Sequence, residues 1–201
     1  LEEGFHGNED DYYDPRNSHL DYVIDRRMGI PITLSILYIE IARYAGFAVQ
    51  GVGFPQHFLV KYETPQETII LDPFNMGLAL NEGHLVQRLQ VNTGGTVPFR
   101  THYLAAVTKR QIITRVLNNL KSIYVSSRDY SQTRIIINML LEISPWDLDE
   151  IRDRGKTSLQ LRDYPQALTD LETYLEFNHE ATDAFVIQKS IRYIKTLVSS
   201  G

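Results

Sequence analysis

Residues 29–77 read GIPITLSILYIEIARYAGFAVQGVGFPQHFLVKYETPQETIILDPFNMG, and this stretch decides the fold. Its first part, over 33–47, has apolar residues at steps of three and four and the helix-stopping Gly46, which predicts a buried helix. The pattern then changes to short segments rich in Val, Ile and Phe over 48–54, 57–62 and 68–74. Turn-forming residues separate these segments, which predicts three strands. Because the middle pair has the pattern of a hairpin, we expect an antiparallel sheet packed on the helix.

The regions on either side of this stretch differ from one another. Residues 1–16 are acidic, aromatic and rich in turn formers, which indicates an ordered lead-in to a short helix capped by Asn17 or Ser18. From Lys109 onward almost all apolar residues have helical spacing. We therefore predict an α+β domain over 1–105, followed by an all-α helical tail over 106–201.

The tail contains an internal repeat. Arg128-Asp129-Tyr130 recurs as Arg162-Asp163-Tyr164, 34 residues later, which is the tetratricopeptide period. Gly155 and Ala167 fall on the small positions that let paired helices pack closely, and Pro145 falls on the closing turn. Two degenerate repeats are predicted, because three positions depart from the pattern: Lys121, Thr133 and His179.

Composition excludes several classes of function. The formal net charge of −5 gives no basic footprint for nucleic acid, and no apolar stretch approaches the length of a membrane span. No signal peptide is visible, and zero cysteines favour a cytoplasmic protein without thiolate chemistry. Because the sequence begins at Leu1 rather than Met, we expect a natural N-terminal segment, and part of the core with it, to lie outside it.

Four motifs together resemble a known family: NSHLDYVIDRRMGIPITL over 17–34, GVGFPQHFLV over 51–60, LDPFN over 71–75 and the two Arg-Asp-Tyr repeats. The chain resembles the transglutaminase-like superfamily, and within it the bacterial SirB-type branch with a tetratricopeptide-like tail. The resemblance implies a papain-like, cysteine-protease type of core. It also implies that His57 matches the catalytic histidine and Asp72 the aspartate that orients it. The nucleophilic cysteine of the family would fall near Ile32, and isoleucine cannot attack a carbonyl.

Other interpretations of these residues remain open. His57 and Asp72 can form a structural pair, contact a ligand or act in catalysis, and Asp72 before Pro73 also fits an Asx turn. Thr33 fits a helix N-cap. As an alternative, Thr33 or Ser35 could replace the lost thiol as a nucleophile paired with His57.

No cofactor or metal is predicted. His57, His84 and His102 lack the spacing of a zinc motif, and no phosphate-binding or dinucleotide-binding glycine motif is present. The stretch VNTGGT over 91–96 could cradle an anion, but a connecting loop is the favoured interpretation.

The sequence thus predicts a non-catalytic module that binds a protein or peptide partner through its remnant cleft and its repeat tail. The alternative is a cysteine-independent hydrolase or acyl-transfer enzyme that uses Thr33 or Ser35 with His57 and Asp72. A structural subunit without an open cleft is a third possibility. The partner and the oligomeric state do not follow from the sequence.

Overall fold

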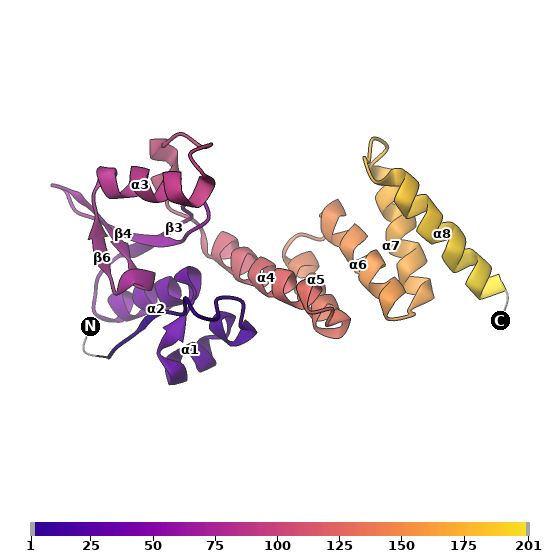
Figure 1. The fold of residues 1–201 in the computed structure, drawn as a ribbon, viewed down its shortest axis with the longest axis horizontal. Coiled ribbons are helices and arrows are strands. Elements are labelled where there is room, and N and C mark those ends of the chain that lie inside the picture. The colour runs from indigo at the N-terminus through magenta and orange to yellow at the C-terminus, as the bar shows by residue number, and fades with distance from the viewer. Residues whose placement is uncertain (1–2, 200–201) are drawn as a thin grey trace. The chain divides into compact units, whose positions relative to one another are not determined.

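The computed structural model describes residues 3–199 and divides into two compact units, with Val116 ending the first and Leu117 beginning the second. Figure 1 shows the helices and strands of both units. The first unit contains, in order, β1 (His6–Gly7), α1 (Leu20–Arg26), β2 (Met28–Gly29), α2 (Pro31–Tyr44), β3 (Val49–Val52), β4 (Leu59–Glu63), β5 (Thr68–Asp72), β6 (Leu78–Leu80) and α3 (Glu82–Thr93). Short 3₁₀ turns η1, η2 and η3 lie at Pro15–Ser18, Pro73–Asn75 and Thr101–Leu104.

The first unit is built on a four-stranded antiparallel sheet in the order β3-β4-β5-β6. The register places Val60 opposite Leu71 and Gly51 opposite Val60. Helix α2 packs against β3 and β4, and in Figure 1 it lies on the face of the sheet opposite to α3. The predicted α+β class, with a helix and three antiparallel strands, is confirmed. The expectation of a buried helix needs correction, because only the first turn of α2, over 31–35, is buried and the rest of the helix is partly or fully exposed.

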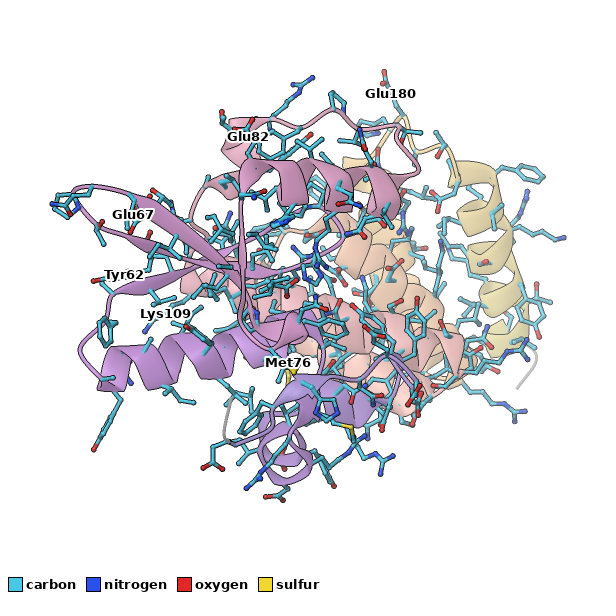
Figure 2. The ribbon with its side chains drawn as sticks, turned by 60° about the vertical axis from the view of Figure 1, so that its left-hand side comes forward. Tyr62, Glu67, Met76, Glu82, Lys109 and Glu180 are labelled. Atoms are coloured by element: carbon cyan, nitrogen blue, oxygen red, sulfur yellow. The ribbon has the colours of Figure 1, made fainter. Side chains whose placement is uncertain are left out.

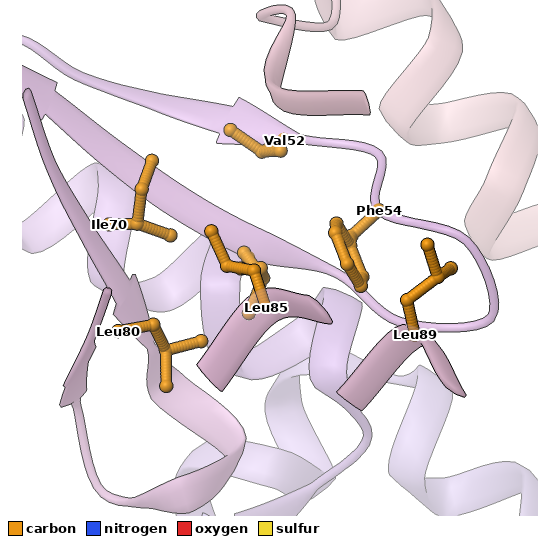
Figure 3. Packing of buried hydrophobic residues seen from close by; sticks show 7 residues of the cluster. Val52, Phe54, Ile70, Leu80, Leu85 and Leu89 are labelled. Atoms are coloured by element: carbon orange, nitrogen blue, oxygen red, sulfur yellow. The ribbon is translucent and has the colours of Figure 1, made fainter. Parts of the chain in front are cut away.

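The core of this unit lies between the sheet and α3. Figure 3 shows Leu85 and Leu89 of α3 facing apolar side chains of the strands and of the β3–β4 loop. The buried cluster consists of Val52, Phe54, Leu59, Ile70, Leu80, Leu85 and Leu89. Burying a large aliphatic side chain is worth about 1.5–3 kcal/mol, so this cluster fixes the sheet against α3.

Several local expectations need correction. Strand β4 begins at Leu59, so His57 precedes it in a turn where its N–H donates to the Phe54 carbonyl at 3.0 Å. Strand β6 and helix α3 were not expected, and α3 includes residues 91–93 of the stretch interpreted as a loop. The connecting loop begins only at Gly94, which ends α3 with φ of 61°.

The expected N-caps also differ from the observed ones. Helix α1 begins at Leu20 with His19 as its N-cap, because 15–18 form a 3₁₀ turn capped by Asp14. Helix α2 has Ile30 as its N-cap. Thr33 lies in its first turn, where its hydroxyl accepts a hydrogen bond from the Ile30 N–H at 3.2 Å.

Helix α4 (Lys109–Ser126) spans the division between the units, and the second unit continues as antiparallel helical pairs. Its further helices are α5 (Tyr130–Ile143), α6 (Leu148–Gln160), α7 (Tyr164–Phe177) and α8 (Ala184–Ser199). Tyr130 and Tyr164 are the first residues of α5 and α7, and each follows an aspartate N-cap. Thr133 and Ala167, 34 residues apart, are both fully buried. The two Arg-Asp-Tyr motifs therefore make the same helix connection.

Candidate functional site

The structure brings His57 and Asp72 together. The His57 Nε2 atom lies 3.0 Å from Oδ1 and 3.1 Å from Oδ2 of Asp72. His57 is only 6% exposed and Asp72 is fully buried. Since a carboxylate can only accept, Nε2 is the donor, and Nδ1 is left to face another group.

Asp72 is held in place by the turn that follows β5. Its Oδ1 accepts from the backbone N–H groups of Phe74, at 3.1 Å, and Asn75, at 3.4 Å. Its Oδ2 accepts from the Asn75 Nδ2 at 2.7 Å. The Asp72 side chain thus forms the Asx turn and pairs with His57 at the same time, because each carboxylate oxygen can accept more than one hydrogen bond.

Arg88 of α3 completes this cluster. Its Nη2 lies 3.0 Å from Asp72 Oδ2. Burial raises the pKa of Asp72, but hydrogen bonds from His57 and Asn75 and the Arg88 charge outweigh it and hold the pKa below the ordinary value. Asp72 is therefore ionised at neutral pH and orients the imidazole. We refer to His57, Asp72, Phe74 and Arg88 as the His57 site.

His57 has two further neighbours, an aromatic ring at its imidazole and a cation at its backbone carbonyl. The imidazole lies edge-on to Phe74, with ring centroids 5.9 Å apart. Arg115 of α4 donates from Nη2 to the His57 carbonyl at 2.7 Å. Arg115 thus holds the backbone before β4, and Phe74 contacts the imidazole.

The residues at the start of α2 have other partners. Ile32 is buried in an apolar cluster with Ile30 and Phe58. The Thr33 hydroxyl donates to the Asn17 carbonyl, at 2.8 Å, and to the Ile30 carbonyl, at 3.1 Å. Ser35 is fully buried and its Oγ has no hydrogen-bond partner within residues 3–199. The hydrogen bonds of the His57 ring therefore run to Asp72 and to neither hydroxyl.

An apolar groove of about 670 Å³ lies in the same unit, beside α2. Its walls come from the lead-in, α2, the first three strands of the main sheet and the turn after β5, and Figure 2 labels two of its residues, Tyr62 and Met76. Met76 and Ile41 are each 64% exposed. The groove lining includes Phe5, Leu34, Leu37, Ile41, Phe47, Tyr62, Leu71 and Met76.

Sequence reasoning missed the groove and the two arginines. The groove combines segments from four parts of the chain, so no local pattern marks it. Arg88 lies on a helix that was not expected, and Arg115 was one of several basic residues on α4. Asn75 could have been found, because it belongs to the quoted LDPFN motif and follows Asp72 at the spacing of an Asx turn.

The described residues show no group of three or more His, Asp or Glu side chains that could hold a metal ion. Within the same residues, no helix combines the length and apolar character that a membrane span requires.

Comparison with known proteins agrees with this architecture. A family model described as the transglutaminase-like superfamily matches residues 1–118, which is more than half of the sequence. The chain belongs to the transglutaminase-like superfamily. A second model, of the tetratricopeptide repeat, matches residues 120–192. The predicted combination of a transglutaminase-like domain and a tetratricopeptide tail is therefore confirmed.

Curated relatives of this transglutaminase-like protein place it in the SirB-type branch. It is 38% identical over 176 residues to a UPF0162 protein of Xylella fastidiosa (strain Temecula1), covering 86% of the chain and 63% of that relative. It is 32% identical over 174 residues to a UPF0162 protein of Vibrio cholerae serotype O1, covering 86% of the chain and 64% of that relative. The chain thus spans less than two thirds of these relatives.

F-box only protein 21 is a further relative, and that of Pongo abelii is 26% identical over 202 residues, which cover 95% of this chain and 32% of that protein. F-box only protein 21 of Mus musculus is 42% identical over 71 residues, which cover 35% of this chain and 11% of that protein.

Proposed function

We propose that this transglutaminase-like protein is a non-catalytic cytoplasmic module that binds a peptide segment of a protein partner. The observation that carries the proposal is the use of the Thr33 hydroxyl as a structural group. Its hydrogen bonds with the Ile30 N–H and carbonyl close the first turn of α2, and the one to the Asn17 carbonyl ties that turn to η1. Since isoleucine stands near the place where the resemblance puts the family's cysteine, the His57 site has a base and an orienting carboxylate but no acidic nucleophile.

The apolar groove supports the binding part of the proposal. Contiguous exposed apolar surface on a soluble protein commonly marks an interaction site. The groove volume of about 670 Å³ suits the apolar side chains of one peptide segment rather than a large rigid domain. The repeat tail adds a second surface, since tetratricopeptide stacks present extended faces to partners. The cytoplasmic setting rests on the absence of cysteine.

The test is selection of peptides from a random displayed library on the immobilised protein. We expect enriched apolar peptides whose binding is lost in Ile41→Glu, which puts a charge into the groove. Tyr44→Glu is the matched control, because Tyr44 lies on the same helix, is 92% exposed and does not line the groove. Absence of enrichment, or equal loss in both variants, would contradict binding through this groove.

A second candidate function rests on Ser35. A fully buried hydroxyl without a hydrogen-bond partner is unusual and is one mark of a functional group. If Ser35 acted as a nucleophile, the protein would be a hydrolase or acyl-transfer enzyme. We rank this second because a serine hydroxyl needs its base in direct contact, and within residues 3–199 the His57 ring hydrogen-bonds only to Asp72.

A further inference from the structure

Arg115 differs from the other half-buried arginines of the protein. Within residues 3–199, each of the others has an aspartate oxygen within 4 Å: Arg26, Arg88, Arg134, Arg152 and Arg154. Arg115 has no carboxylate at that distance in the same residues, and its acceptors are backbone carbonyls. A guanidinium that is partly removed from water without a counter-charge is costly, which calls for an explanation.

The contacts of Arg115 leave part of its guanidinium group available. Its Nη2 donates to the His57 carbonyl at 2.7 Å and lies 3.5 Å from the Phe54 carbonyl. Its Cζ is 5.5 Å from the centre of the Phe58 ring. The Nε and Nη1 atoms have no acceptor among the described residues. Neither of these two nitrogen atoms is fully buried without a partner in those residues, so both donors reach solvent. Burial lowers the pKa of Arg115, but guanidinium remains charged in proteins.

The lead-in loop brings Tyr12 close enough to Arg115 for the two to interact electrostatically. Asn17, fully buried, donates from Nδ2 to the carbonyls of Asp11, at 2.7 Å, and Tyr12, at 3.2 Å. Buried Asn8 donates to Asn17 at 3.1 Å, so the loop is fixed by an amide pair. Burial raises the pKa of Tyr12, and the charge of nearby Arg115 opposes that shift. Tyr12 thus stays protonated at neutral pH, and its O–H remains a hydrogen-bond donor.

Aromatic rings connect these donors to the histidine. The ring centroid of Tyr12 lies 6.4 Å from that of Phe74, whose own centroid is 5.9 Å from that of His57. With Nε2 donating to Asp72, His57 Nδ1 is an acceptor. Two donors, one acceptor and an apolar ring are the complement of a peptide end: a carboxylate, an amide N–H and a side chain.

We propose that Arg115, Tyr12 and His57 form a recognition site for the carboxylate end of a peptide. Arg115 binds the carboxylate with its free N–H groups, Tyr12 donates a further hydrogen bond, and His57 Nδ1 accepts from the last amide N–H. Phe74 contacts the apolar side chain of the last residue. This inference rests on the proposed peptide-binding function and names the chemistry that these residues recognise, of which His57 and Phe74 also belong to the His57 site.

The experiment compares two probes that differ in one group. N-acetyl-Ala-Phe is titrated as the free acid and as the C-terminal amide into the full chain, and binding is followed by NMR of backbone and arginine side-chain N–H groups. We expect the acid to bind at least about tenfold more tightly than the amide, because hydrogen bonds to charged groups are the stronger ones. Shifts should centre on Arg115, Tyr12 and His57.

Variants test whether Arg115 causes the preference for the free acid over the amide. Arg115→Gln should abolish the preference for the acid, while Arg192→Gln, on an exposed arginine of α8, should leave it unchanged. Arg115→Lys keeps the charge and loses the planar fork, so we expect an intermediate preference. Should Arg115→Gln fail to fold, Tyr12→Phe provides the test, because it removes one hydroxyl of a partly exposed residue and should reduce the preference severalfold.

Equal binding of acid and amide, or no binding of either, would overturn this inference. Inorganic phosphate binding as tightly as the acid would also overturn it, since the site would then be a general anion site. These outcomes are separate from the groove experiment, because peptide selection lost in Ile41→Glu would stand whether or not the carboxylate is recognised.

Discussion

Arg128 and Arg162 have the same left-handed backbone conformation, with φ of 58° and 60°, immediately before the helices α5 and α7. In both connections the next residue is an aspartate whose N–H donates at 2.9 Å to a carbonyl five residues earlier, on Tyr124 or on Ser158. Its side chain then caps the following helix. The repeat therefore copies a complete helix connection, down to its unfavourable φ angle.

Because the two connections are equivalent, glycine substitutions at Arg128 and Arg162 should change the free energy of unfolding equally. Arg128→Gly and Arg162→Gly should each relieve left-handed strain of about 1 kcal/mol and lose a similar amount to unfolded-chain entropy. We expect the two free energies of unfolding to agree within about 0.5 kcal/mol of each other and of the wild type. Arg192→Gly, inside α8, should destabilise by about 1 kcal/mol. Urea denaturation measures all three, and unequal values at the two repeat sites would contradict equivalence.

Ala167 predicts a packing effect. It is fully buried within the apolar cluster of α7 and α8. Ala167→Phe should lower the free energy of unfolding by about 1–3 kcal/mol through overpacking. Thr169→Phe, two residues later at an exposed position of the same helix, is the control and should have little effect. A melting midpoint for Ala167→Phe that matches the control would mean that the helices are not closely packed there.

Asp72 predicts a dependence of stability on pH. Its pKa in the folded state lies below the ordinary value, so its stabilisation is fully present above about pH 4 and declines as pH falls through the folded pKa. Asp72→Asn should therefore destabilise strongly at pH 7 and less at pH 3. Asp25→Asn, on an exposed carboxylate of α1, is the control. A destabilisation by Asp72→Asn that stays constant between the two pH values would contradict an ionised, paired Asp72.

Catalysis is tested by a broad screen of peptide, amide and ester substrates, including transamidation. We expect no turnover by the wild type, because no residue of the sequence supplies a thiolate and the Thr33 hydroxyl is held by backbone groups. An activity that disappears in His57→Ala and in either Thr33→Ala or Ser35→Ala would establish the enzyme instead. Activity unchanged in His57→Ala would be a contaminant, since a hydroxyl requires its base.

Much of this arrangement could be predicted from the sequence. The change of apolar period at residue 48 predicted the sheet, and the resemblance to the transglutaminase-like superfamily predicted that His57 and Asp72 belong to one site. Helix α3 was missed because most residues in the middle of its sequence are polar, and its buried apolar face is limited to Leu85 and Leu89. The polar residues include Gln87, Arg88, Gln90 and Asn92. Arg88 and Arg115 then could not be placed, since their partners lie far away in the chain.

The packing of Ile32 has a consequence for any attempt to place a thiol at this position. A cysteine there would join the apolar cluster of Ile30 and Phe58, where burial raises the pKa of a thiol, but it would also lie in the first turn of α2, where the helix N-terminus lowers that pKa. Substitution of Ile32 alone would thus set these two effects against one another, and the packing of the neighbours would determine how much thiolate forms.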